Sequence, residues 1–179
     1  MTINFILTGP AGIGKSTVVA DAVERHRNLN WRGFTSMSII ENGERVGWTL
    51  KGINSVEGTL AHVSLESEIR MGRYGIDLEL FASIVDAELD QNQPADAYVI
   101  DEIGLISAMY PPFDPLLNAC LDSETPVIAI VREKSTEILA SIEARSDMEV
   151  LRVESTKSGL ASVLIDDWIS SVSSRCPLV

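Results

Sequence analysis

The sequence predicts an α/β fold, in which a mostly parallel central sheet is flanked by helices and carries an antiparallel hairpin addition. Apolar runs bounded by turn residues alternate with helical patterns along the chain, which is typical of a parallel sheet covered by helices. A glycine-rich loop at 9–17 separates the first apolar run from the first helical pattern, and an Asn-Gly pair at 42–43 joins two strand-like segments. A chain of 179 residues fits a single domain, 1–179, with a hairpin elaboration at about 31–78.

The first third of the chain is predicted to hold one strand, one helix and the hairpin. The apolar run Ile3 to Leu7 predicts a strand, and the pattern after the glycine-rich loop predicts a helix from about Lys15 to Arg27. Trp31 to Ile40 and Arg45 to Ile53 are the two expected hairpin strands, because Asn-Gly is the preferred centre of a tight type I′ turn.

The middle third is predicted to contain short strands, a helix and a buried strand. Thr59 to Leu65 and Arg73 to Leu78 have the pattern of short strands, and a helix is expected from about Glu79 to Asn92. Ala97 to Glu102 is a continuous apolar run that ends in two carboxylates, which is typical of a strand buried on both faces.

The last third is predicted to alternate strands and helices. Val127 to Val131 is a second fully apolar strand, a helix follows from Ser135 to Arg145, and Glu149 to Val153 has the pattern of another strand. A final helix, capped by Ser158, is expected to pack through one apolar face. The predicted residues of that face are Leu160, Val163, Leu164, Trp168 and Val172.

The loop at 9–17 matches the phosphate-binding pattern G-x-x-x-x-G-K-[ST] at every fixed position. Its glycines let successive N–H groups turn inward around a phosphate, and the N-terminus of the following helix adds positive potential. Lys15 is predicted to reach the β- and γ-phosphates, and Ser16 to offer its hydroxyl to Mg²⁺. The ligand class is therefore a nucleotide with Mg²⁺. The predicted nucleotide-binding residues are Gly9, Pro10, Ala11, Gly12, Ile13, Gly14, Lys15, Ser16 and Thr17.

Two carboxylates end the strand that begins at Ala97, so they are expected at the carboxyl edge of the sheet, where α/β sheets bind ligands. Asp101 is predicted to help hold Mg²⁺, because a hard cation favours oxygen ligands. Glu102 is predicted to be the general base that polarises the water attacking the γ-phosphate. A carboxylate pair of this kind beside the phosphate loop indicates a hydrolytic site.

Arg132 follows the strand 127–131 directly, so it is expected at the same edge of the sheet. A planar cation there is predicted to stabilise charge on the γ-phosphate oxygens, which makes Arg132 a candidate catalytic residue. The alternative is that Arg132 pairs with a surface carboxylate near the start of the following helix.

The segment Asp101-Glu-Ile-Gly104 also fits the D-x-x-G pattern of regulatory GTPases. The guanine-reading Asn-Lys-x-Asp motif of those proteins is absent from the sequence. The pattern therefore favours the RecA-like type of P-loop NTPase over the GTPase type, and guanine selectivity is not predicted.

The charge of the chain limits its expected partners. The chain has 14 Lys and Arg against 26 Asp and Glu, a formal net charge of -12, whereas a nucleic-acid surface needs clustered basic residues. The sequence contains no apolar stretch of membrane-spanning length and leaves no room for a leader before Gly9, so a cytoplasmic protein is expected. Cys120, Cys176, His26 and His62 lack the spacing of metal ligands.

Four segments of the chain carry a family resemblance: GPAGIGKST, GWTLKGI, RMGRYGIDLELF and VIDEIGLIS. In order and spacing they are similar to the small cancer-related nucleoside-triphosphatase family, over most of the chain. The resemblance implies a RecA-like sheet with a hairpin elaboration and slow, Mg²⁺-dependent hydrolysis of several nucleoside triphosphates to diphosphate and phosphate. It does not imply a known cellular role, and it leaves any protein partner unknown.

The resemblance also assigns residues. The family's phosphate loop falls on 9–17 and its carboxylate pair on Asp101 and Glu102. Arg70 and Arg73 match its Arg-x-Gly-Arg-Tyr-Gly element, so Arg73 is a candidate catalytic residue. The alternative is a structural turn whose arginines bond carbonyls or carboxylates.

The chain departs from the family pattern in two places. Leu105-Ile-Ser107 stands where the family usually has a basic residue, Met and Glu, and Glu154-Ser-Thr-Lys-Ser158 stands where many members have Asn-Arg. The second departure means that the contacts with the base that the family resemblance would assign there are not expected in this chain. The motifs that this chain does have recognise phosphates and Mg²⁺ and not the base, so broad use of nucleoside triphosphates is expected by default.

Two other functions fit the same motifs. In a nucleotide or small-molecule kinase, Asp101 or Glu102 would activate an acceptor hydroxyl in place of water, with an acceptor pocket in the region Trp31 to Ile53. In a nucleotide-dependent switch, slow hydrolysis would reset a surface that binds a protein partner, and the hairpin and Pro111-Pro-Phe113 would be its contact sites.

Overall fold

The computed structural model describes residues 4–154 and 158–173, and within these ranges the chain forms a nine-stranded mixed sheet and five α-helices. In chain order the strands are β1 (Asn4–Thr8), β2 (Trp31–Glu41), β3 (Glu44–Gly52), β4 (Glu57–His62), β5 (Arg70–Met71), β6 (Tyr74–Ile76), β7 (Ala97–Ile103), β8 (Val127–Val131) and β9 (Met148–Arg152). The helices are α1 (Lys15–Arg25), α2 (Leu78–Glu88), α3 (Phe113–Asp122), α4 (Thr136–Glu143) and α5 (Ser158–Ser173), with a 3₁₀ turn at Ser107–Met109.

The sheet has two regions, with the strand order β5-β6-β4-β3-β2-β7-β8-β1-β9. In the parallel region, β2, β7, β8, β1 and β9 run parallel to one another. In the antiparallel extension, β3, β4, β6 and β5 continue the sheet from β2. The predicted α/β fold with an antiparallel addition is confirmed, and the addition comprises four strands.

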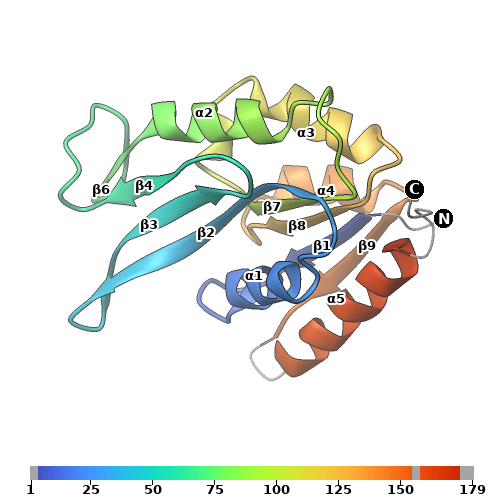
Figure 1. Ribbon diagram of the computed structural model, residues 1–179. Coiled ribbons are helices and arrows are strands. Elements are labelled where there is room, and N and C mark those ends of the chain that lie inside the picture. The colour runs from blue at the N-terminus through green and yellow to red at the C-terminus, as the bar shows by residue number, and fades with distance from the viewer. Residues whose placement is uncertain (1–3, 155–157, 174–179) are drawn as a thin grey trace.

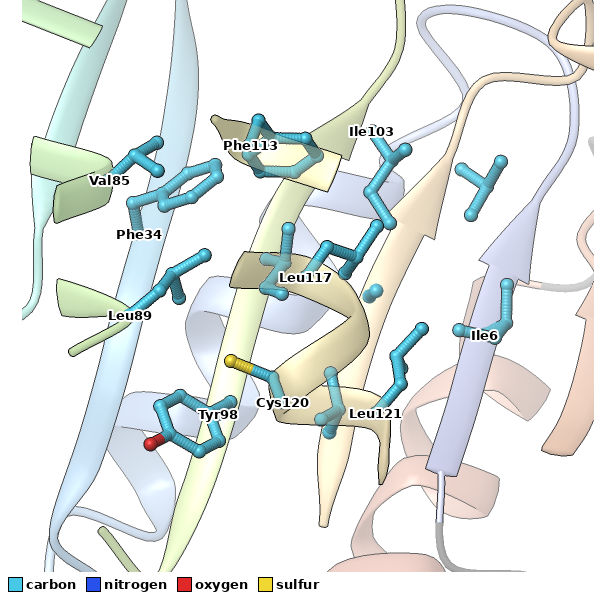
Figure 2. Packing of buried hydrophobic residues seen from close by; sticks show 14 of the residues in the cluster. Ile6, Phe34, Val85, Leu89, Tyr98, Ile103, Phe113, Leu117, Cys120 and Leu121 are labelled. Atoms are coloured by element: carbon cyan, nitrogen blue, oxygen red, sulfur yellow. The ribbon is translucent and has the colours of Figure 1, made fainter. Parts of the chain in front are cut away.

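Helices cover both faces of the parallel region, as Figure 1 shows: α1 and α5 on one face, and α2, α3 and α4 on the other. The buried strands alternate between the two cores, because successive side chains point to opposite faces. Phe5 of β1 packs with α1 and α5, whereas Ile6 packs in the core under α2, α3 and α4. Figure 2 shows this second core, where Phe34 of β2 lies beside Phe113 and Leu117 of α3.

The predicted hairpin is formed by β2 and β3. Asn42 has φ 50° and Gly43 has φ 80°, the two positive values that a type I′ turn requires. A second, smaller hairpin joins β5 and β6 across Gly72, where only the region from Arg73 onward was expected to be a strand. A two-residue strand such as β5 leaves no periodic pattern from which the sequence could predict it.

Two helix ends and one whole helix differ from prediction. Helix α1 ends at Arg25, whereas its end was expected at about Arg27. Helix α2 ends at Glu88, whereas its end was expected at about Asn92. The side chain of Asp90 accepts a hydrogen bond from the Asn92 N–H (3.0 Å), a local turn that competes with the helix. Helix α3 was missed, and its first residue, Phe113, is fully buried, so the segment 111–113 does not offer Phe113 to a partner.

The apolar face predicted for α5 is partly wrong. Leu160 and Val163 are 49% and 57% exposed. The buried stripe of the helix lies at neighbouring positions. Each residue turns the helix by about 100°, so a shift of one position in the predicted face places a surface residue where a core residue was expected. The buried residues of α5 are Ala161, Ile165, Trp168, Ile169 and Val172.

The carboxyl ends of β1, β8 and β7 are adjacent in the sheet, because β8 lies between the other two strands. The phosphate loop follows β1, Arg132 follows β8, and Asp101 and Glu102 lie near the end of β7. The fold therefore brings all three predicted functional segments to one edge. None of the described helices is long and apolar enough to cross a membrane.

Candidate active site

The phosphate loop lies between the buried strand β1 and helix α1. Gly9, Gly12 and Gly14 all have positive φ values, of 140°, 82° and 89°. At Gly9 a Cβ would lie 2.3 Å from the carbonyl oxygen of Val153, so glycine is required there by close approach as well as by conformation. Ile13 packs against the core beneath the loop, which anchors the loop to the sheet.

Lys15, the first residue of α1, is 8% exposed and lies inside the loop. Its Nζ donates hydrogen bonds to the carbonyl oxygens of Gly9 (2.9 Å) and Pro10 (2.8 Å). Burial lowers the pKa of Lys15, whereas the nearby carboxylates of Glu102 and Asp101 favour its charged form. The ammonium is thus a buried cation facing two carboxylates.

Asp101 is 1% exposed and its carboxylate is fully engaged. One oxygen accepts a hydrogen bond from Ser16 Oγ (3.1 Å), and the other accepts from the N–H (3.2 Å) and Oγ (3.3 Å) of Ser36. Burial raises the pKa of Asp101 to about 6. The contact with Ser16 brings together the two residues predicted to hold Mg²⁺.

Glu102 differs from its neighbour because it is exposed to the cleft. Partial removal from water still raises the pKa of Glu102, opposed by the positive charges of Arg132, Lys15 and Arg45. A Cβ on Gly104 would lie 3.3 Å from Glu102 Oε1 and 3.4 Å from Arg132 Cβ, so Gly104 leaves room for both side chains. Glu102 is therefore a carboxylate with a raised pKa that lies near three positively charged side chains.

Arg132 lines the same cleft, as predicted. Its backbone N–H donates to the carbonyl oxygen of Ile103 (3.0 Å), which ties the end of β8 to the end of β7. Within the part of the chain that the structure describes, Arg132 forms no ion pair with a carboxylate of the following helix. The alternative expectation for Arg132 is therefore not supported.

Arg73 lies outside the lining of the cleft, contrary to the expectation that it contacts the nucleotide. Its Nη2 donates to the carbonyl oxygen of Arg45, and its Nη1 lies 4.0 Å from Glu44 Oε2. Arg70 in turn donates to the carbonyl oxygen of Arg73 (2.8 Å). The geometry matches the structural alternative, in which these arginines hold a turn.

The cleft has a volume of about 890 Å³ and extends from the phosphate loop to the antiparallel extension. Ala11, Ser16 and Thr17 line one end, together with Arg132 and Glu102. The other end is apolar and aromatic. Its lining includes Phe34, Trp48, Leu50, Leu60, Tyr74 and Phe81.

Sequence reasoning missed Ser36, Arg45, Trp48 and Tyr74, which all belong to the cleft. Trp48 and Tyr74 form an edge-to-face pair with ring centroids 4.7 Å apart, although they are far apart in the sequence. The alternation of small and apolar residues along β2 and β3 is the signal that could have placed Ser36 and Trp48 on one face. Trp48 and Tyr74 lie within the segments GWTLKGI and RMGRYGIDLELF that carry the family resemblance, but that resemblance was not used to assign them a role.

The histidines and cysteines behave as ordinary side chains where they are described. His26 Nε2 lies 3.1 Å from Asp166 Oδ1, His62 bonds Ser64, and Cys120 is a buried free thiol. In residues 4–154 and 158–173, no group of three or more His, Cys, Asp or Glu side chains could hold a metal ion. Cys176 lies outside the described residues, and so do residues 155–157 of the segment 154–158 that departs from the family pattern.

A phosphate loop after β1, facing a carboxylate pair at the end of β7, defines the class of P-loop nucleotide-binding α/β proteins. A family model described as NTPase matches residues 4–163 of the chain. The chain belongs to this NTPase family.

Curated relatives and solved structures agree with this assignment. A nucleoside-triphosphatase THEP1 of Thermofilum pendens is 35% identical over 156 residues, which cover 84% of this chain and 86% of the relative. The THEP1 of Thermotoga sp. (strain RQ2) is 27% identical over 165 residues, with 91% and 94% covered.

Two solved structures share the fold. The crystal structure of THEP1 from Aquifex aeolicus has a TM-score of 0.77 at 20% identity and covers 94% of this chain and 98% of that one. The solution structure of a human cancer-related nucleoside triphosphatase has a TM-score of 0.74 at 25% identity, covering 96% and 97%. The family resemblance found in the sequence is confirmed.

Proposed function

We propose that this chain is a Mg²⁺-dependent nucleoside-triphosphatase that hydrolyses ATP, GTP and other nucleoside triphosphates to diphosphate and phosphate. One observation carries the proposal: Glu102 is exposed to the cleft beside the buried Lys15, while its neighbour Asp101 is buried against Ser16. Membership of the NTPase family, and curated relatives named nucleoside-triphosphatases, support hydrolysis.

The phosphate loop and Lys15 would bind the triphosphate. The positive φ values of Gly12 and Gly14 suit a loop whose N–H groups turn toward a phosphate. The N-terminus of α1 adds positive potential at the same place. Lys15 can exchange its two carbonyl partners for oxygens of the β- and γ-phosphates, because a charged acceptor makes the stronger hydrogen bond.

Ser16 and Asp101 suit Mg²⁺. A hydroxyl and a carboxylate are hard oxygen donors, and Mg²⁺ typically takes few protein ligands because phosphates and water supply the rest. The raised pKa of Asp101, about 6, reflects a buried negative charge that a cation would stabilise. Bound there, Mg²⁺ would neutralise charge on the β- and γ-phosphate oxygens.

Glu102 would act as the general base. A water oxygen forms the new bond to the γ-phosphorus while the bond from that phosphorus to the β–γ bridging oxygen breaks, leaving the diphosphate. The proton lost by the water passes to Glu102 and then to solvent. A raised pKa makes this carboxylate a better proton acceptor than an ordinary surface glutamate. Arg132, on the same cleft wall, would stabilise charge on the γ-phosphate oxygens.

A kinase remains the second candidate because of the apolar end of the cleft. Trp48 and Tyr74, which line the cleft there and are only half-buried, could hold the body of an acceptor molecule in the hairpin region, where such a pocket was expected. In that reaction an acceptor hydroxyl would replace water. No observation in the described residues favours the switch. A single domain, a cytoplasmic location and the lack of a nucleic-acid partner stay predictions from the sequence.

The test is phosphate release by the purified protein from ATP, GTP, CTP and UTP, with Mg²⁺ and with EDTA. Release from all four with Mg²⁺, with a fall of about a hundredfold or more in Glu102→Gln, is the expected result, because that is the scale of a lost general base. The matched control is Glu124→Gln, since Glu124 is an exposed glutamate that precedes β8 at the opposite edge of the sheet.

Three outcomes would contradict the proposal or a part of it. Turnover by Glu102→Gln at the wild-type rate would show that Glu102 is not the general base. Nucleotide binding without phosphate release, followed by rapid ADP formation when small hydroxyl compounds are added, would favour the kinase. Full turnover in EDTA would show that hydrolysis does not require Mg²⁺.

A further inference from the structure

Arg45 is turned toward the cleft by an irregularity in the hairpin. Ser38 pairs with Trp48 and Ile40 pairs with Arg45, with a register shift between Ile39 and Ile40. Ser38 and Ile40 are two residues apart and therefore share a face, so their partners share that face as well. In a regular strand, residues three apart such as Arg45 and Trp48 would lie on opposite faces. The extra residue, a β-bulge, re-aims the arginine.

The guanidinium of Arg45 lies between an aromatic ring and the phosphate loop. Its Cζ is 5.4 Å from the centroid of the Trp48 ring, and its Nη2 would lie 3.9 Å from a Cβ built on Gly12. Its charge lowers the pKa of Glu102 against the effect of burial, as those of Arg132 and Lys15 do. Arg45 therefore belongs to the group of charges around the expected position of the γ-phosphate.

The side chain of Arg45 has unused hydrogen-bonding capacity. Its Nε is buried and has no hydrogen-bond partner among the described residues. Within the same residues it forms no ion pair with a carboxylate. A buried donor without a partner costs stability, which favours binding of an anion that would satisfy it. A phosphate oxygen beside Gly12 is such an anion.

The backbone of Arg45 is fixed by the second hairpin. Its carbonyl oxygen accepts hydrogen bonds from Arg73 Nη2 and from the hydroxyl of Tyr74 (3.2 Å). The Tyr74 ring also packs on Trp48 and lies 5.3 Å from the Arg73 guanidinium. The strand pair β5–β6 thus holds the segment that carries Arg45, which gives Arg73 a part at the site without contact with the nucleotide.

We propose that Arg45 is a catalytic residue of this chain, which contacts the terminal phosphate of the bound triphosphate, and that Arg73 is a positioning residue for it. The inference rests on the proposed function. Arg45 would donate hydrogen bonds to γ-phosphate oxygens and stabilise the charge that develops on them as the bond to the diphosphate breaks. The chain then supplies its own arginine, from the antiparallel extension, and needs none from a neighbouring molecule.

The test compares Arg45→Ala and Arg45→Lys with Lys51→Ala. Lys51 is an exposed cation on the same strand whose side chain faces away from Leu50 and the cleft. For Arg45→Ala we expect kcat to fall about a hundredfold or more, a threshold set below the loss typical of an arginine finger. The affinity for ADP should change by less than about threefold, because ADP lacks the phosphate that Arg45 contacts. Lys51→Ala should match wild type.

Two further readouts separate catalysis from structure. Guanidinium chloride at millimolar concentration should restore part of the turnover of Arg45→Ala and none to Glu102→Gln. Trapping of ADP with aluminium fluoride, an analogue of the transferred phosphate, should be lost in Arg45→Ala.

The positioning role of Arg73 is tested with a double variant. Arg73→Ala should lower kcat in the wild-type background, and have little further effect when combined with Arg45→Ala.

The outcomes distinguish this inference from the proposed function. If wild type releases phosphate and Arg45→Ala does so at more than about a third of that rate, Arg45 is not catalytic while the proposed hydrolysis stands. An equal loss of ADP affinity and kcat would also overturn the role given to Arg45. If wild type releases no phosphate, the proposed function fails. Arg45 is then tested by binding alone, with a preference for a non-hydrolysable ATP analogue over ADP that Arg45→Ala should lose.

Discussion

The parallel region and the antiparallel extension contribute to the cleft in different ways. In the parallel region β1 and β8 are buried along their whole length, and their functional residues follow directly in the sequence. In the extension β3 is only half-buried, and Arg45 reaches the site through a bulge and through contacts with residues about 30 positions away. A functional residue that directly follows a buried strand can be recognised in the sequence as part of a motif. A functional residue whose position depends on strand register cannot be recognised in this way.

The largest effect is expected at Lys15, in the parallel region. Lys15→Ala removes the buried cation of the phosphate loop and should reduce nucleotide affinity or turnover by about a hundredfold or more. The measurement is equilibrium binding of a fluorescent ATP analogue together with steady-state phosphate release. Turnover and affinity within about tenfold of wild type would contradict the role given to Lys15 in binding the triphosphate.

The next effect concerns the shape of the loop at Gly9. An alanine Cβ there would lie 2.3 Å from the Val153 carbonyl, at a φ of 140°, so Gly9→Ala should cost about 2–4 kcal/mol of stability and distort the loop. Urea unfolding measures the loss. Gly159→Ala is the matched control, because a Cβ at Gly159, within α5, meets nothing within 4 Å. That change should be neutral or stabilising by up to about 1 kcal/mol. An equal effect at both glycines would contradict the account.

The buried carboxylate predicts a dependence of stability on pH. Burial raises the pKa of Asp101 from 3.8 to about 6, so the folded protein holds this proton more tightly than the unfolded chain. The stability that Asp101 contributes in its protonated form is therefore present below about pH 4 and lost as pH rises to about 6, a change on the order of 3 kcal/mol.

Urea unfolding of the metal-free protein at pH 5 and pH 7.5 checks this prediction. Wild type should lose more stability than Asp101→Asn between the two values, because asparagine does not titrate in this range. The variant should also lose the ability of Mg²⁺ to support turnover. Parallel behaviour of the two proteins across this pH range would contradict the raised pKa of Asp101.

The smallest effect is expected in the extension. Tyr74→Phe keeps the ring packed on Trp48 but removes the hydroxyl that bonds the Arg45 carbonyl, which should cost about 0.5–1.5 kcal/mol and lower kcat a few-fold. Tyr110→Phe is the matched control, because the Tyr110 hydroxyl bonds Asp86 away from the cleft. A fall in kcat of equal size in both variants would show that the loss is not specific to Arg45.

Most of the parallel region could be predicted from the sequence. The strand at Val127–Val131 matches its predicted bounds, and Asp101 and Glu102 lie at the expected edge, because continuous apolar runs and a contiguous motif depend on local residues. The direction of the Glu102 side chain into the cleft, and the burial of Asp101 against Ser36, depend on the pairing of β2 with β7 and were not predictable.

The extension and the α5 packing were predicted less well, for physical reasons. The turn at Asn42-Gly43 was predicted because its residues demand one backbone conformation. The direction of Arg45 was not, because a single bulged residue reverses the alternation along β3. In α5, Leu160 and Val163 are as apolar as the buried positions beside them, so composition could not decide which stripe faces the sheet.

A structure of Glu102→Gln with bound ATP and Mg²⁺ tests most directly whether the two regions meet at the terminal phosphate. We expect the γ-phosphate within hydrogen-bonding distance of both Lys15 and Arg45, with Mg²⁺ held through Ser16 and Asp101 and residue 102 facing the γ-phosphorus. A γ-phosphate bound by Lys15 while Arg45 stays stacked on Trp48, out of reach of the nucleotide, would contradict the account.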